Sequence, residues 1–337
     1  MAQKAMSTEA TIPVIDPFSA VKDPKMPFLA QALDPAIAHE QISKTWTGKQ
    51  PFHLSEIRVC RYKPGRRCLI EYSFQTKTLI GKVRAKGTNH ATHDIQCALW
   101  QNGFDAQSAD GISVPEPVGL IPSFHMTLQM KVPGKSATQF LSGPDGPALA
   151  RPIAEAAAKL HRTRIATSRR HTMEDELRIL YDRLGQVAQS KAQWTDRLLR
   201  ILVACDRLGR RMSSEVACGI HRDFYSDHVL IDDSGRLWLL DFDLYCQGDP
   251  ALDMGNFIGH LTEQSLRTQS NPAAMKVQER ALEDRFVEIH GESIRWRVRA
   301  YAILSLTRHI YISRLFPDRK IYTGKLIELC EEQLTEL

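Results

Sequence analysis

The spacing of hydrophobic residues changes near position 134 and divides the chain into a strand-rich part and a helix-rich part. From 57 to 86, three short segments rich in β-branched and aromatic residues are separated by turn residues. Two similar segments, VPEPVGLI and FHMTLQMKV, precede the Pro133-Gly134 pair. We therefore expect a small antiparallel sheet in the first part of the chain.

Apolar residues beyond Gly134 recur at the spacing of amphipathic helices. We expect a helix that Pro152 opens, a long helical region over 173–212 with a break near Gly185 or Ser190, and a helix over 294–315. The arginines of the last helix are expected on a solvated face over an apolar stripe. A hairpin over 218–243 interrupts these helices.

The first fifty residues are expected to lie outside the sheet. Residues 1–25 mix polar side chains with three prolines, which predicts a loose arm. Asp34 and Pro35 have the positions of an N-cap and a first helical residue, so they predict a short helix over 35–46. A further helix is expected over 91–102.

Together these elements predict a bilobal α+β protein with its functional site in the cleft between the lobes. The arm and short helix would occupy 1–50. A small lobe built on the sheet would follow over 51–131, and a larger, mainly helical lobe over 132–337.

The composition is typical of a globular protein and excludes several classes of partner. At 337 residues, 43% hydrophobic and 25% charged, the chain can bury a full core. Its net charge of +5 is small and its basic residues are scattered, so no nucleic-acid partner is expected. Seven cysteines without a CxxC pair indicate reduced thiols. The chain lacks a signal peptide core and any apolar run near the roughly 18 residues of a membrane span, which predicts a cytoplasmic protein without a membrane partner.

Two aspartates in the predicted hairpin carry the strongest chemical signal. Asp223 follows His221, and Asp241 ends an apolar strand over 237–240, eighteen residues later. An Asp-Asp-Ser-Gly turn joins this strand to a preceding Val-Leu-Ile strand, so the hairpin brings both carboxylates to one edge. Phosphoryl transfer needs such a pair, because one carboxylate deprotonates the attacking hydroxyl and the other holds a divalent metal. The alternative is that both are ordinary turn or capping aspartates.

A zinc hydrolase site is a second alternative for this segment. His221, Asp223 and His228 are suitable types of zinc ligand. However, an apolar strand follows them directly and no helix carries them, which disfavours this interpretation.

The segment 221–257 resembles the catalytic region of the aminoglycoside phosphotransferase and choline kinase family, relatives of the protein kinases. The resemblance rests on a His-Arg-Asp sequence over 221–223, an Asp-Phe-Asp sequence over 241–243 and the block GDPALDMGNF. It implies a protein-kinase-like fold with two lobes.

The resemblance also implies roles for five residues of this segment. Asp223 would be the catalytic base, beside Arg222, which would neutralise nearby charge. Asp241 would be the main Mg²⁺ ligand, while His221 and Asp253 would support the catalytic loop.

His228 departs from the family pattern, because it stands where the family has a metal-binding asparagine. Mg²⁺ prefers oxygen ligands, whereas an imidazole suits softer ions. Three consequences remain open: the second metal is absent, His228 binds an ion such as Mn²⁺, or His228 contacts phosphate. The alternative is a packed histidine without such a role.

The resemblance places a nucleotide on the small lobe. Lys82, on its third strand, matches the lysine that binds ATP phosphates in the family, and Lys86 is the second candidate. The acidic helix partner of this lysine has only Asp94 as a candidate. Gln129 and Met130 fall in the segment between the lobes, where backbone groups would meet the adenine edge.

A basic turn replaces the glycine-rich loop that kinases place over the phosphates. Its backbone N–H groups and four cations are expected to bind the triphosphate. The cations are Arg61, Lys63, Arg66 and Arg67. A solvated basic turn is the alternative.

The sequence therefore predicts an enzyme, a phosphotransferase that moves the γ-phosphate of ATP or GTP to a hydroxyl of a small molecule, with Mg²⁺ or Mn²⁺ as cofactor. A nucleotide-binding regulator without catalysis is the first alternative, because of His228 and the missing glycine loop. A protein kinase is the second, and the Asp-Phe-Asp sequence argues against it.

Overall fold

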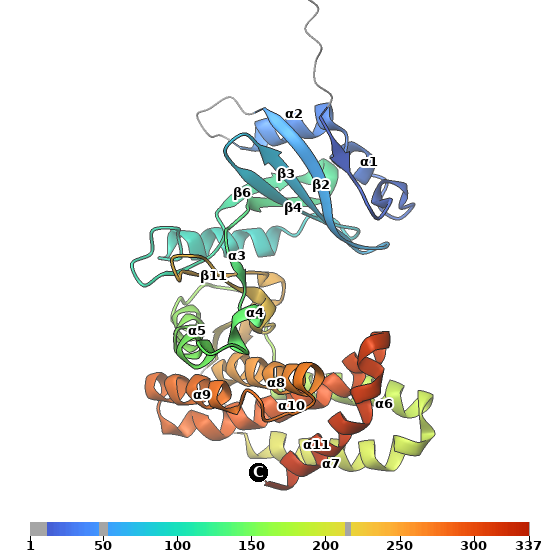
Figure 1. Ribbon diagram of the computed structural model, residues 1–337, viewed down its shortest axis with the longest axis vertical. Coiled ribbons are helices and arrows are strands. Elements are labelled where there is room, and N and C mark those ends of the chain that lie inside the picture. Colours follow the sequence, from blue (N-terminus) through green and yellow to red (C-terminus); the bar gives the residue numbers. More distant parts are fainter. Residues whose placement is uncertain (1–11, 47–52, 213–216, 337) are drawn as a thin grey trace, which may run out of the picture. The chain divides into compact units, whose positions relative to one another are not determined.

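The computed structural model describes residues 12–46, 53–212 and 217–336 (Figure 1). The chain folds into two compact units. Unit 1 comprises 1–106 with 114–132, and unit 2 comprises 107–113 with 133–337. Unit 1 is built on a sheet, whereas unit 2 is mainly helical, which confirms the predicted α+β class.

The sheet of unit 1 has six strands in the order β1-β2-β3-β4-β7-β6. All neighbours are antiparallel except β1 and β2. The strands are β1 (Val14–Ile15), β2 (Leu54–Lys63), β3 (Arg67–Phe74), β4 (Thr78–Arg84), β6 (Pro117–Ile121) and β7 (Met126–Met130). The five segments predicted as an antiparallel sheet are confirmed as β2, β3, β4, β6 and β7.

Alternation along β3 gives this sheet a buried face, because its residues are buried at every second position from Cys68 to Phe74. Helices α1 (Leu29–Ala32) and α2 (Pro35–Thr45) lie against the sheet (Figure 1). Helix α3 (His90–Gln101) follows β4 in the sequence. Asp34 caps α2 by accepting hydrogen bonds from the backbone N–H groups of Ala36 (3.0 Å) and Ile37 (2.9 Å), as expected.

The predicted loose arm is wrong for residues 12–25. Val14 pairs with Ile57 in a parallel bridge between β1 and β2. Asp23 is buried and accepts hydrogen bonds from the Gly65 N–H (2.6 Å) and the Tyr62 hydroxyl (2.8 Å). The prediction rested on the polar composition of this segment. It is wrong because a buried carboxylate that accepts hydrogen bonds, such as Asp23, can order a polar segment. Residues 1–11 lie outside the described part of the chain.

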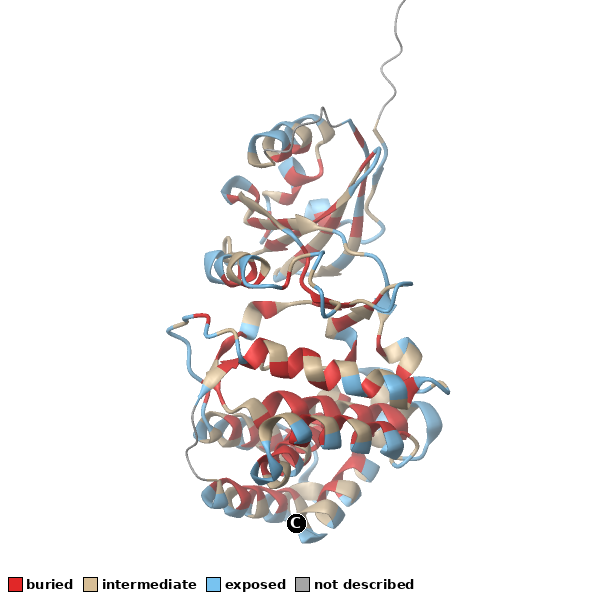
Figure 2. Cartoon of the chain, turned by 90° about the vertical axis from the view of Figure 1, so that its left-hand side faces the viewer, coloured by how far each residue is buried: buried red, intermediate tan, exposed pale blue. Residues whose placement is uncertain are grey.

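Unit 2 contains eight α-helices within the described residues. They are α4 (Thr138–Leu141), α5 (Gly146–His161), α6 (Met173–Ser190), α7 (Thr195–Arg211), α8 (Pro250–Gln269), α9 (Lys276–His290), α10 (Arg295–Leu315) and α11 (Thr323–Glu336). Buried residues run along the helices in the middle of this unit (Figure 2). None of the helices in the described ranges combines the length and apolar character that a bilayer crossing needs.

One predicted helix boundary is corrected by the structure and another is confirmed. Pro152 lies inside α5, and Pro147 instead occupies the first turn, where a missing N–H is tolerated. The burial of the apolar face around Ile153 and Leu160 offsets the interior proline. Of the two positions predicted for the break within 173–212, Ser190 is confirmed because α6 ends there, whereas Gly185 lies within the helix.

Unit 2 contains two short sheets within the described residues, and one of them contains the predicted hairpin. One has the order β5-β11-β10-β8 and the other pairs β12 with β9. The strands are β5 (Ile112–Ser113), β8 (Lys135–Ser136), β9 (Cys218–Ile220), β10 (Val229–Ile231), β11 (Leu237–Leu239) and β12 (Cys246–Gly248). Val229 pairs with Leu239 at the end of the β10–β11 hairpin.

Helices α8 and α10 approach each other closely. A Cβ atom on Gly255 would lie 2.4 Å from Cβ of Tyr301, so only glycine fits there. This proximity buries part of the arginine row of α10, which was expected to be solvated. Arg297 is buried and its Nε donates to Asp249 Oδ2 (3.0 Å), and Arg308 reaches acceptors on α6 and α8.

Asp23→Asn should lower the melting temperature at neutral pH. Hydrogen bonds from Gly65, Tyr62 and Lys25 hold the pKa of Asp23 below its usual value, with Gly65 as the largest cause. A lowered folded-state pKa contributes stability above the unfolded-state pKa of about 3.9, and this contribution is lost as the pH falls through the folded value.

Thermal melts of wild type and Asp23→Asn across pH 2–8 would measure the effect, with the exposed Asp94→Asn as control. We expect the difference between wild type and Asp23→Asn to shrink below about pH 4. A difference that is constant with pH would contradict this role of Asp23.

Candidate active site

The loop that follows β9 is anchored by a carboxylate from α8. Asp253 is fully buried, and its Oδ2 accepts from the His221 N–H (2.8 Å) while its Oδ1 accepts from the Arg222 N–H (2.7 Å). The Nε2 atom of His161 donates to the same Oδ2 atom (2.8 Å). Arg222 has φ = 67°, a left-handed conformation that is unfavourable for a non-glycine residue. The two hydrogen bonds from the His221 and Arg222 N–H groups to Asp253 hold the backbone in this conformation.

The two carbonyl groups that follow are also held by side chains. The Asp223 carbonyl accepts from His228 Nδ1 (2.8 Å), and the Phe224 carbonyl accepts from Asn256 Nδ2 (3.0 Å). Asp223 therefore has anchored backbone on both sides. Its own side chain stays accessible, with 40% of its surface exposed.

Asp241 follows β11 and lies next to the same histidine. The His228 ring has its Nδ1 atom 3.6 Å from Asp223 Oδ2 and its Nε2 atom 3.8 Å from Asp241 Oδ2. The predicted meeting of two carboxylates at one edge of the hairpin is therefore present, with His228 between them. Asp241 also has a left-handed backbone (φ = 65°), and its side chain is 23% exposed.

The hydrogen bond of His228 defines which ring nitrogen carries the proton. A carbonyl only accepts, so Nδ1 must donate to Asp223, and Nε2 faces Asp241. Burial lowers the pKa of His228, against the opposing charges of Asp223 and Asp241. A neutral imidazole with Nε2 available beside a carboxylate fits a divalent cation, particularly one softer than Mg²⁺.

The described residues contain no set of three or more His, Cys, Asp or Glu side chains arranged to hold a metal ion. This disfavours the zinc alternative. His221 is fully buried, and its Nε2 donates to the Leu240 carbonyl (2.8 Å), so that nitrogen is committed. A cation at Asp241 and His228 would need further ligands from a substrate, as Mg²⁺ sites that share nucleotide phosphates do.

Arg222 lies close to a second, buried carboxylate. It is among the cations that lower the pKa of Glu176, after the effects of burial, His171 and Arg308. The expected role of Arg222 in neutralising charge at the site stays a prediction.

The candidate nucleotide residues lie in unit 1. Lys82 is half-buried on β4, opposite Leu69 of β3 and Thr127 of β7. Gln129 and Met130 lie on β7, where the Met130 N–H donates to the Glu116 carbonyl (2.9 Å). That donor is thus used within unit 1 and would not meet an adenine edge.

The basic turn between β2 and β3 uses its backbone donors internally. The Gly65 N–H donates to Asp23, and the Arg66 N–H donates to the Lys63 carbonyl (3.0 Å). The expected backbone cradle for phosphate is therefore corrected to a cluster of side-chain cations. Partial burial, followed by the charges of Arg67, Arg61 and Arg66, lowers the pKa of Lys63, which indicates dense positive charge.

The sequence matches the model of the phosphotransferase enzyme family over residues 82–287. The chain belongs to this family. The match confirms the resemblance inferred from the catalytic segment. A search of the curated proteins gave no match.

Solved structures support the fold of this phosphotransferase. A putative aminoglycoside phosphotransferase from Ralstonia eutropha has a TM-score of 0.65 at 13% identity, with 90% of this chain and 98% of that chain covered. A choline/ethanolamine kinase family protein from Mesorhizobium loti has a TM-score of 0.58 at 17% identity, with 91% and 93% covered. Spectinomycin phosphotransferase in complex with ADP and spectinomycin has a TM-score of 0.56 at 12% identity, with 84% and 92% covered.

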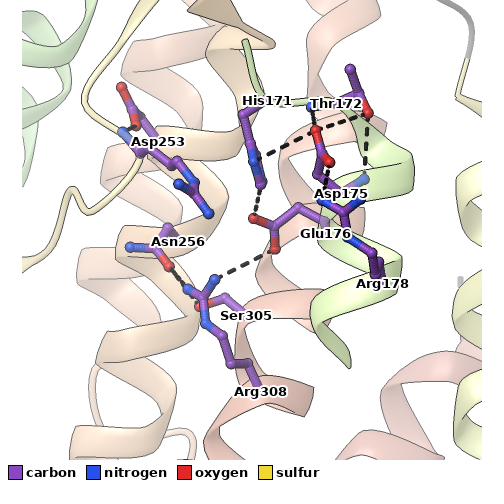
Figure 3. A network of polar contacts seen from close by, with 10 residues as sticks. His171, Thr172, Asp175, Glu176, Arg178, Asp253, Asn256, Ser305 and Arg308 are labelled. Carbon is purple, nitrogen blue, oxygen red and sulfur yellow. Dashed lines mark hydrogen bonds and ion pairs between the residues drawn. The ribbon is translucent and has the colours of Figure 1, made fainter. Parts of the chain in front are cut away.

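Sequence reasoning missed the buried polar residues behind the loop over 221–228 of the phosphotransferase. Figure 3 shows Glu176, Asn256 and Arg308 in one network with His171 and Ser305. Asn256 lies in the GDPALDMGNF block, so its position within that block was an available signal. Glu176 and Arg308 had none, because they lie far away in the sequence.

Asp253→Ala should destabilise the phosphotransferase strongly. The change leaves the amides of His221 and Arg222 and the His161 ring without their acceptor, at roughly 1–3 kcal/mol for each buried donor. Urea unfolding would measure this loss, with Asp182→Ala as control because the Asp182 side chain is 60% exposed. Equal unfolding midpoints for the two variants would rule out the anchoring role.

Proposed function

We propose that this phosphotransferase transfers the γ-phosphate of ATP or GTP to a hydroxyl group of a small molecule. The observation that carries the proposal is the arrangement of Asp223, His228 and Asp241 on an anchored loop and hairpin. The ADP and spectinomycin in the similar spectinomycin phosphotransferase are the kind of nucleotide and acceptor that this function requires.

Asp223 is proposed as the catalytic base. The acceptor hydroxyl approaches its exposed carboxylate and gives up its proton to it. The hydroxyl oxygen forms a bond to the γ-phosphorus while the bond from phosphorus to the leaving diphosphate oxygen breaks. His221 and Asp253 act on this step only by fixing the loop.

Asp241 and His228 are proposed to hold the metal. A divalent cation held there, Mg²⁺ or Mn²⁺, would neutralise charge on the nucleotide phosphates. The imidazole favours Mn²⁺ more than the asparagine of the family pattern would.

The nucleotide is proposed to bind residues of unit 1. Lys82 and the cations of the basic turn are suited to the phosphates, because their charge opposes that of a triphosphate. The turn cations are Arg61, Lys63, Arg66 and Arg67. The β7 residues Gln129 and Met130 are proposed to lie beside the base, with the Met130 N–H kept on the Glu116 carbonyl.

The alternatives lose support. A regulator without catalysis was suggested by His228, yet its Nε2 atom faces Asp241 as a metal ligand would. A protein kinase stays disfavoured by the Asp-Phe-Asp sequence over 241–243.

Asp223→Asn should abolish phosphate transfer without weakening nucleotide binding. Asparagine keeps the size of the side chain but cannot accept the proton, and loss of a general base costs roughly 10²–10⁴-fold in rate. Radiolabelled ATP with Mn²⁺ or Mg²⁺ and a panel of sugars, amino alcohols and aminoglycosides would measure transfer, and calorimetry would measure ATP affinity.

Asp233→Asn is the matched control, because Asp233 lies exposed in the turn of the same hairpin. It should transfer phosphate like the wild type. Undiminished transfer by Asp223→Asn would refute the proposed function.

A further inference from the structure

A buried chain of polar contacts reaches the catalytic loop from the helical interior of unit 2 (Figure 3). His171 Nε2 lies 2.5 Å from Glu176 Oε1, and Arg308 Nη1 lies 3.4 Å from Glu176 Oε2. Arg308 also donates through Nη2 to Asn256 Oδ1, and Asn256 Nδ2 donates to the Phe224 carbonyl (3.0 Å). These polar contacts thus join α6, α10 and α8 to the residue after Asp223.

Glu176 is ionised within this series of polar contacts. Burial acts to raise the pKa of Glu176, but the hydrogen bond of His171 and the charge of Arg308 together lower it. A buried ion pair seldom stabilises a fold more than well-packed apolar residues would, and its better-attested use is to specify geometry. The Arg308–Glu176 pair can specify geometry at Asn256, which Arg308 also contacts.

What the Arg308–Glu176 pair specifies is the orientation of the Asn256 side chain. An asparagine amide has a donor end and an acceptor end of nearly equal size, and either could face the loop. Arginine only donates, so Arg308 requires the Oδ1 end of Asn256 to face it, and the Ser305 hydroxyl bonds the same atom (2.9 Å). The Nδ2 end must then face the Phe224 carbonyl, as observed.

We propose that Glu176 and Arg308 are positioning residues for the transfer reaction, acting through Asn256. By fixing the donor end of Asn256, they hold the Phe224 carbonyl while His228 holds the carbonyl of Asp223. The backbone on the C-terminal side of Asp223 is then as fixed as Asp253 makes it on the N-terminal side. This inference rests on the proposed role of Asp223 as the base.

Asn256→Asp tests the orientation with the smallest change. Aspartate keeps an acceptor for Arg308 but loses the donor, so a carboxylate oxygen would face the Phe224 carbonyl. Arg308→Met removes the group that orients Asn256, and Arg308→Lys keeps the charge without the two-pronged donor. Arg207→Met is the control, because Arg207 lies exposed on α7, away from this network.

Two readouts separate positioning from general loss of stability. Amide hydrogen exchange reports the order of 221–228 relative to the interiors of α6, α8 and α10. Phosphate release from ATP with Mn²⁺ gives kcat and the KM for ATP without an identified acceptor. Misplacement of a reacting group by about 1 Å costs on the order of 10²-fold in rate.

We expect Asn256→Asp and Arg308→Met to speed exchange selectively over 221–228 and to lower kcat by about 10²-fold with an unchanged KM for ATP. Arg308→Lys should recover part of both, and Arg207→Met should match the wild type. Unchanged exchange over 221–228, or exchange that rises equally in the three helices, would overturn the proposal. If wild-type phosphate release is too slow to measure, exchange alone decides.

Failure of the proposed function gives a different result. Phosphate transfer by Asp223→Asn would refute the role of Asp223 as the base, whatever the hydrogen exchange of the Asn256 and Arg308 variants. Selective loosening of 221–228 would then still establish the mechanical link from Arg308 to the loop.

Discussion

The hydrogen bonds of the Asp253 carboxylate are the interaction on which the site depends. A fully buried carboxylate is costly unless its acceptors are used, and Asp253 uses them on two consecutive loop amides and the His161 ring. These bonds maintain the left-handed backbone of Arg222, a conformation that persists only when the surrounding structure imposes it. The next residue, Asp223, is thereby placed with its backbone fixed and its side chain open to solvent.

His228 contacts both the candidate base, Asp223, and the candidate metal ligand, Asp241. Its Nδ1 atom supports the loop through the Asp223 carbonyl, and its Nε2 atom lies beside Asp241. One side chain therefore joins the candidate base to the candidate metal ligand. An asparagine at this position would offer an oxygen to a cation, whereas the imidazole offers a nitrogen, so metal preference is the property most directly affected.

The sequence was informative where the cause of structure is local. Alternation along β3, the Asp34 cap and the β10–β11 hairpin each depend on residues close in sequence, and each was predicted. It was uninformative where distant residues decide. Gly65 and Asp23 are 42 residues apart, and Arg308 and Glu176 are 132 apart, so no pattern indicated these contacts. The arginines of α10 were assigned to solvent for the same reason, because the close packing against Gly255 appears only in the folded chain.

The most direct test of the proposed metal site is a crystal structure with Mn²⁺ and the ATP analogue AMP-PNP, with anomalous diffraction used to locate manganese. We expect a manganese peak in contact with both Asp241 Oδ2 and His228 Nε2, with the γ-phosphate facing the Asp223 carboxylate. A peak bound only by other groups, with His228 Nε2 engaged elsewhere, would contradict it.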